Sequence, residues 1–252
     1  MWIITKNAWK ERIRRKELYI VVAIAILILL MCSSGSATIT IEGEPITSFE
    51  NMFMVIHTLM NAVGCILAVI LSIGTIPKEY ERKNSHLIWV RGITQQTYHA
   101  GLTLANILSG VFAMLILYLA LAVYIIVNGQ WDYLFRMLPA FLIVSINVAL
   151  TSLFVSVLTI PLPTMAAGAM GIIFAAVGIL HSILNIYKNI AGGIAGTLLN
   201  GILHIFPDMH GIQRQAQNIM AQKTADIHLI LVGILTLYII SLGLFIFKRK
   251  EA

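Results

Sequence analysis

The chain has 252 residues, of which 59% are hydrophobic and only 11% charged, and its mean hydropathy is +0.89. Soluble domains carry about 25% charged residues, so this composition excludes a large soluble domain and indicates a protein that lies in a bilayer. The net charge of +6 comes from residues that flank apolar runs. These residues do not form a basic domain face, which argues against a nucleic-acid partner.

Six apolar runs are each long enough to cross the roughly 30 Å hydrocarbon core as a helix. Helices are required because lipid offers the backbone N–H and C=O groups no hydrogen-bonding partner. We therefore predict an all-α integral membrane protein with a single transmembrane domain over residues 1–252. The predicted spans are residues 18–38, 50–76, 101–127, 137–159, 164–187 and 227–247.

Residues 1–17 form a basic segment in front of the first span. Trp2, Trp9, Ile13 and Ile20 are spaced by 7, 4 and 7 residues, which places them on one face of a helix. A helix of this kind lies on the inner membrane surface, whereas the alternative is a basic flank without a helix. A cleaved signal peptide is the less favoured alternative, because five more spans follow. The residues assigned to the interfacial helix are Trp9, Arg12, Ile13 and Arg15.

Lysine and arginine collect on one side of the predicted spans. With the N-terminus in the cytoplasm, 13 of the 17 basic residues lie inside. The inner face is then strongly positive and the outer face slightly negative, as the positive-inside rule requires. We therefore predict that the N- and C-termini are both cytoplasmic.

Residues 77–100 form a long inner connection with a charged block at its start. Pro77 is predicted to end the second span, Gly92 to end a short surface helix, and Gly101 to open the third span. A plain connection needs only about 2–8 residues, whereas this one spends about 24 and includes Trp89. A solvated loop is the simplest interpretation, but the excess length favours a docking surface. Its candidate residues are Pro77, Lys78, Glu79, Tyr80, Glu81, Arg82, Lys83 and Arg91.

Residues 188–226 precede the last predicted span. Residues 190–206 are apolar and contain four glycines, so they could form a seventh span. A seventh span would place the basic C-terminal tail outside, against the charge rule. We therefore predict a re-entrant or interfacial helix on the outer face, followed by a polar, helical outer segment over residues 209–226.

The predicted spans hold no Asp, Glu, Lys or Arg in their interiors, so ion-coupled transport has little support. The chain has no phosphate-binding loop, and its seven histidines are scattered over different segments, which argues against a metal site. Neutral polar groups inside spans either join helices or line a substrate pathway. The candidates are His57, Asn61, Asn106 and Asn147.

The whole layout resembles the ABC-2-type permease family, the membrane subunits of ABC exporters. The most specific stretch is "IPKEYERKNSHLIWVRGITQQTYHAG" (residues 76–101), which is similar to the family's segment of an acid after span two, a basic run and a short helix. The resemblance implies a dimer that docks separate ATP-binding subunits on the cytoplasmic side of a bacterial membrane. It places Glu79, Tyr80, Glu81, Arg82 and Lys83 in the coupling region.

By this resemblance the chain is a transporter subunit without its own ATPase site. It needs no cofactor, and the partner subunit binds ATP and Mg²⁺. The second permease subunit can be another copy of this chain or a related one. Small permeases of this size resemble exporters of bacteriocins, lantibiotics and other amphipathic peptides, which is an argument from analogy. The alternatives are an ATP-independent carrier or channel and a membrane-embedded enzyme.

Overall fold

The structure is a computed structural model and describes residues 1–14, 17–33, 40–41, 44–45, 49–81 and 92–247. The described chain is almost entirely helical, with one small antiparallel hairpin that pairs Thr40 with Pro45 and Ile41 with Glu44. In chain order the elements are α1 (Trp2–Arg14), α2 (Glu17–Ser33), β1 (Thr40–Ile41), β2 (Glu44–Pro45), α3 (Phe49–Ile73), α4 (Thr75–Glu81), α6 (Gln95–Val127), α7 (Trp131–Leu158), α8 (Thr164–Ile179), α9 (His181–Ala191), α10 (Gly193–Ile205), α11 (Met209–Met220) and α12 (Ile227–Ile246).

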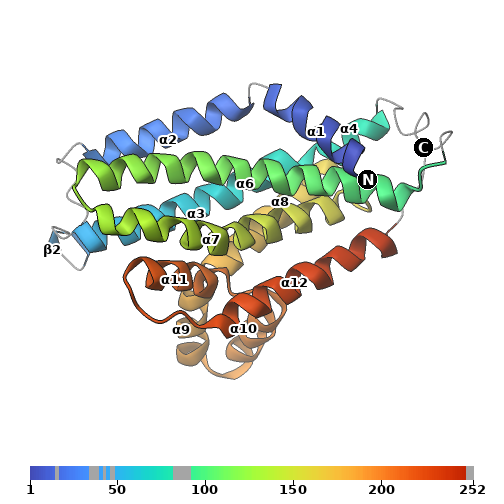
Figure 1. Cartoon of the computed structure of the whole chain (residues 1–252). Coiled ribbons are helices and arrows are strands. Elements are labelled where there is room, and N and C mark those ends of the chain that lie inside the picture. Colours follow the sequence, from blue (N-terminus) through green and yellow to red (C-terminus); the bar gives the residue numbers. More distant parts are fainter. Residues whose placement is uncertain (15–16, 34–39, 42–43, 46–48, 82–91, 248–252) are drawn as a thin grey trace.

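The long helices run along one common direction (Figure 1). Helices α1 and α4 lie at one end of this bundle, together with the C-terminal end of α12, and we call this the N-terminal end. Strand β2 and the turn between α6 and α7 lie at the opposite end, which we call the distal end. Helices α9 and α10 project sideways from the bundle.

Helix α7 is at the centre of the bundle and packs against α3, α6, α11 and α12. In the apolar 18-residue stretch of α7, 72% of the residues are buried, the highest share among the candidate spans. Small residues let the neighbouring helices approach closely. At Gly110 of α6, an added Cβ would lie 2.9 Å from Val148 Cγ1 of α7. The core is therefore built on α7, and the other long helices pack around it.

Four continuous helices are long and apolar enough to cross a membrane, namely α3 with α4, α6, α7 and α12. The pair α8 and α9 would add a fifth crossing if it is one bent span. Helix α2 has 17 residues and contains a shorter apolar stretch, Tyr19–Ile28. The chain is therefore a multi-pass membrane protein, and the exact number of six spans stays a prediction.

Helices extend beyond two of the predicted span limits, and where the membrane ends there stays a prediction. Pro77 does not end a helix, because it lies in the first turn of α4, where a missing N–H costs no helical hydrogen bond. The helix that contains Gly101 begins earlier, because α6 starts at Gln95 and Thr94 Oγ1 accepts a hydrogen bond from Thr97 N as its N-cap. The predicted loop over residues 77–100 is thus helical at both ends. Gly92 has φ +77°, and the surface helix predicted before it lies outside the described residues.

The predicted fifth span over residues 164–187 is not straight. The chain bends by 73° between α8 and α9, at Leu180. The bend brings His181 to the end of α10, where its Nε2 lies 3.3 Å from Leu203 O. Gly192 joins α9 to α10 with φ +55° and ψ −176°, a conformation that only glycine adopts readily. Helix α10 has 13 residues, fewer than the about 20 that a crossing needs, so it does not form a seventh span.

A test of topology follows from Figure 1, in which α1 and the end of α12 lie at the same end of the bundle. A short tag placed before residue 1 and another after residue 252 should be accessible from the same membrane side. We expect both to react with an impermeant reagent in inside-out vesicles and neither in intact cells. Tags on opposite sides would contradict an even number of spans.

Candidate functional site

Helix α1 packs on the start of α6 at the N-terminal end of the bundle. Thr5 Oγ1 donates a hydrogen bond of 3.0 Å to Gly101 O. An added Cβ at Gly101 would lie 3.0 Å from Ile4 Cγ2, so the missing side chain lets α1 come close. The Trp9 ring meets Phe112 edge to face, with centroids 6.3 Å apart. The helix predicted for this segment is therefore confirmed, and it is attached to the bundle by specific contacts.

Most of the predicted apolar stripe is exposed, and its contact with lipid stays a prediction. Trp2, Ile13 and Ile20 are exposed, whereas Arg12 is only 8% exposed and turns inward. The other predicted interfacial residue, Arg15, lies outside the described residues. An arginine directed into the protein needs a partner, because a desolvated charge is costly on its own. Arg12 therefore shows where α1 is connected to the interior.

A row of polar side chains leads from Arg12 into the bundle. Arg12 Nη2 donates to Thr75 Oγ1, and Thr75 Oγ1 donates to Asn106 Oδ1 at 2.8 Å. Asn106 Nδ2 donates to Ser156 Oγ at 2.8 Å, and Ser156 Oγ donates to Ser152 O at 2.7 Å. We call Arg12, Thr75, Asn106 and Ser156 the N-terminal polar row. It joins α1, the start of α4, α6 and α7, which are four elements far apart in the sequence.

Helix α4 is attached to the start of α6 by its own side chains. Glu79 Oε2 accepts a hydrogen bond from Tyr98 Oη at 2.7 Å. Tyr80 Oη accepts from Gln95 Nε2 at 2.6 Å and lies 2.8 Å from His99 Nε2. The two α4 side chains, which were predicted to face a partner protein, therefore make contacts inside this chain.

The remaining candidate docking residues differ in how far their side chains are exposed. Pro77 is buried, whereas Lys78 and Glu81 are exposed on the outer side of α4. Arg82, Lys83 and Arg91 lie outside the described residues. Among the docking candidates that the structure describes, the exposed ones are thus Lys78 and Glu81.

A second polar group lies deeper in the bundle and holds α11. Asn147 Nδ2 donates to Met209 O at 2.8 Å and to Asn61 Oδ1 at 3.3 Å. Asn61 Nδ2 donates to Gln213 Oε1 at 2.9 Å, and Gln213 Nε2 donates to Thr58 Oγ1 at 2.6 Å. We call Thr58, Asn61, Asn147 and Gln213 the central polar cluster. It connects α3, α7 and α11, so α11 is a buried part of the bundle even though its sequence is polar.

His57 makes a separate contact. Its Nε2 lies 2.6 Å from Tyr118 Oη of α6, and its ring stacks at 29° on Phe53 with centroids 5.9 Å apart. The four predicted pathway residues thus separate: Asn106 belongs to the N-terminal polar row, Asn61 and Asn147 meet, and His57 pairs with Tyr118. Each bonds to another helix of the same chain, which favours the interpretation that they join helices.

Sequence patterns alone do not identify Thr75, Ser156 or Gln213 as members of these polar groups. Thr75 and Ser156 look like ordinary small residues in apolar runs. Gln213 and Gln217 are four apart and therefore share one face of α11, and this face also carries the buried Met209 and Ala216. This spacing was the available signal that α11 buries its glutamines.

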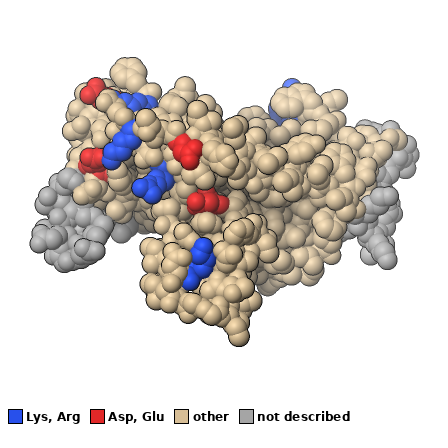
Figure 2. All heavy atoms as spheres, turned by 90° about the horizontal axis from the view of Figure 1, so that it is seen from below, with Lys and Arg blue, Asp and Glu red and all other residues tan. Residues whose placement is uncertain are grey.

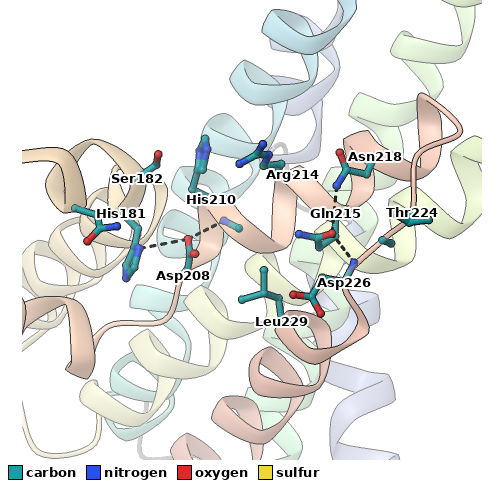
Figure 3. A pocket seen from close by; sticks show the side chains of 13 residues that line it. His181, Ser182, Asp208, His210, Arg214, Gln215, Asn218, Thr224, Asp226 and Leu229 are labelled. Carbon is teal, nitrogen blue, oxygen red and sulfur yellow. Dashed lines mark hydrogen bonds and ion pairs between the residues drawn. The ribbon is translucent and has the colours of Figure 1, made fainter.

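A polar cavity of about 430 Å³ lies between α9, α11 and the start of α12 (Figure 3). Five of its lining residues carry ionisable side chains, namely His181, Asp208, His210, Arg214 and Asp226. Within the described parts of the chain, no group of three or more His, Cys, Asp or Glu side chains is arranged to hold a metal ion.

Comparison with known proteins supports a transporter. No curated protein matches the chain. The family described as "ABC-2 family transporter protein" matches residues 2–252, which is nearly the whole length. The apolar helices and this match agree on a membrane component of an ABC transporter, a component that generally has no ATPase site of its own. The chain therefore belongs to the ABC-2 family of transporter membrane proteins.

Proposed function

We propose that this chain is the permease subunit of an ATP-driven exporter in the bacterial cytoplasmic membrane. Two permease subunits form the pathway, and separate subunits bind ATP and Mg²⁺ and dock at the N-terminal end. The observation that carries the proposal is the N-terminal polar row, in a chain that belongs to a transporter family. Through this row, a docked ATP-binding subunit has a continuous hydrogen-bonded connection to the helices of the bundle.

The coupling route begins at α1 and α4. An ATP-binding subunit that moves these two helices displaces Arg12 and Thr75 together, because their side chains are joined by a hydrogen bond. Thr75 passes the displacement to Asn106 of α6, and Asn106 passes it to Ser156 of α7. Transport needs contacts that differ between inward- and outward-facing states, and hydrogen bonds between whole helices can be exchanged in this way.

The docking surface in this proposal includes fewer residues than the predicted set, which was residues 77–83 and Arg91. Lys78 and Glu81 are exposed and can contact the ATP-binding subunit directly. Glu79 and Tyr80 hold α4 against α6. Charged side chains on an exposed helix fix the register of a partner through complementary charge. Arg82 and Lys83 follow directly in the sequence and lie outside the described residues.

The surface of α12 supports a second permease subunit. In the apolar 18-residue stretch of α12 only 11% of the residues are buried, although the helix is long enough to span a membrane. Such a helix is covered by lipid or by another membrane subunit. The substrate that fits best is an amphipathic peptide or another hydrophobic compound, because the described spans offer apolar and neutral polar surfaces to it.

Gentle purification tests the docking. A tagged chain isolated in mild detergent should retain an ATP-binding subunit of roughly 25–35 kDa, the size of one or two small domains. Exchanging the exposed charges, by Lys78→Glu with Glu81→Lys, should lower the amount retained about tenfold. A matched exchange at the distal end, Asp132→Lys with Lys223→Glu, should leave it unchanged. Transport by a purified chain that retains no such subunit would contradict the proposal and favour an ATP-independent carrier.

A further inference from the structure

The polar cavity between α9, α11 and α12 is not used by the coupling route. It forms where α8 bends into α9 and where α12 begins, on the side of the bundle from which α9 and α10 project (Figures 1 and 3). Figure 2 shows that Lys, Arg, Asp and Glu gather over the left part of this face, and that most of the remaining surface is uncharged. The cavity is therefore a polar site beside apolar surface.

The acidic groups of the cavity are held in place. Asp208 Oδ1 accepts a hydrogen bond of 2.7 Å from Gly211 N and lies 3.5 Å from His181 Nδ1. Asp226 Oδ1 accepts from His228 N at 2.9 Å and caps α12, and Asp226 N donates to Gln215 Oε1 at 2.7 Å. These contacts fix two carboxylates at the rim, and each keeps oxygen lone pairs for a further partner.

Two basic groups of the cavity, His210 and Arg214, have no polar partner among the described residues. His210 and Arg214 are four residues apart on α11 and therefore share one face of that helix. Neither side chain makes a hydrogen bond or ion pair with any described residue. Figure 3 shows the two side by side in the upper part of the cavity, with Asp208 and Asp226 below them. The cavity thus presents donors on one side and carboxylates on the other.

Apolar side chains lie beside the polar lining of the cavity. Leu229 of α12 lines it directly. Ile183, Ile186 and Ile190 of α9 are 50%, 57% and 75% exposed, but they share a different face of α9 from His181 and Asn185, which line the cavity. A ligand with a polar head in the cavity can therefore lay a hydrocarbon tail along α12, beside Leu229.

We propose that this cavity binds the headgroup of a zwitterionic phospholipid. The phosphate accepts hydrogen bonds from Arg214 and His210, because guanidinium groups match phosphate oxygens closely. The ammonium group of the same headgroup lies against Asp226 and Asp208. The two carboxylates disfavour a ligand that carries only negative charge. This inference concerns binding alone and does not depend on the proposed export function.

Titration calorimetry on the detergent-solubilised full-length chain tests the proposal with three probes. Dihexanoyl phosphatidylethanolamine carries both charges and acyl chains, dihexanoyl phosphatidylglycerol lacks the ammonium, and O-phosphoethanolamine lacks the acyl chains. We expect the first to bind about tenfold more tightly than the second, because only the first has an ammonium group that the two carboxylates can bind. We expect the third to bind more weakly than the first, because it loses the apolar contacts.

Variants locate the site. Arg214→Gln and Asp226→Asn should each weaken binding of dihexanoyl phosphatidylethanolamine about tenfold. The matched controls Lys223→Gln and Asp132→Asn, at exposed positions outside the cavity lining, should leave it unchanged. Equal binding of the two lipids, or binding that neither cavity variant weakens, would overturn the proposal. Binding of O-phosphoethanolamine as tight as that of the lipid would overturn the membrane lipid as the ligand.

Discussion

Replacing Arg12 with glutamine should lower export about tenfold while ATP hydrolysis by the partner subunit continues. Arg12 is the point at which α1 joins the N-terminal polar row, through its hydrogen bond to Thr75. A hydrogen bond to a charged group contributes about 1.5–3 kcal/mol, which corresponds to about tenfold or more in an equilibrium between two states. The measurement is substrate uptake into inside-out vesicles, with phosphate release followed in the same sample.

The matched control for this variant is Arg14→Gln. Arg14 lies two residues further along α1 and is exposed, so its loss removes the same charge without touching the polar row. We expect Arg14→Gln to transport at the normal rate. Arg12→Lys keeps the charge but loses the planar fork, and we expect intermediate transport. Equal transport by Arg12→Gln and Arg14→Gln, at equal protein levels, would show that coupling does not pass through Arg12.

The apolar runs predicted most of the helices, because a continuous stretch of about 20 apolar residues has few folding options in a bilayer. The bend at Leu180 was not predictable in the same way. Residues 164–187 are apolar enough for one span, and the contacts that bend the chain join His181 to Leu203 and Asp208, which come after the run. Composition reports whether a segment can enter lipid, whereas tertiary contacts decide whether it stays straight.

The charged block at the end of the second span illustrates a similar limit. Its position next to a span predicts an interaction surface, but its residue types do not show that it continues as the helix α4. In the helix α4, successive side chains point in different directions, so Glu79 meets Tyr98 of α6 whereas Glu81 is exposed. The residue types indicated that the block was polar and accessible. Only the helical geometry separates residues that hold the bundle from residues that can meet a partner.

The buried asparagines were predicted as a class, and their partners were not. Asn61, Asn106 and Asn147 lie in apolar runs, where a polar group has to find a hydrogen bond. The partners of Asn61 and Asn147 come from α11, a segment that looks like a solvated outer piece because it holds arginine and several glutamines. Pairings between segments about 60 to 150 residues apart leave no mark on local sequence patterns.

Replacing Asn147 with leucine should loosen α11 from the bundle. Leucine has a similar size but cannot donate to Met209 O or to Asn61 Oδ1, which would stay buried without that donor. We expect the free energy of unfolding to fall by about 1–2 kcal/mol. A cysteine placed at the buried position of Ala216, in a chain whose native cysteines are replaced by alanine, should then react about tenfold faster with a water-soluble maleimide.

The control for this last variant is Asn189→Leu, on the exposed side of α9, where the asparagine makes no hydrogen bond with any described residue. In Asn189→Leu, the rate at which maleimide labels the cysteine at residue 216 should be unchanged. An unchanged rate in Asn147→Leu would show that apolar packing alone holds α11, through Met209, Ile212 and Met220. A faster rate in Asn147→Leu alone would assign the attachment to the central polar cluster, since Asn189→Leu adds the same apolar side chain at an exposed position and removes no hydrogen bond to a described residue.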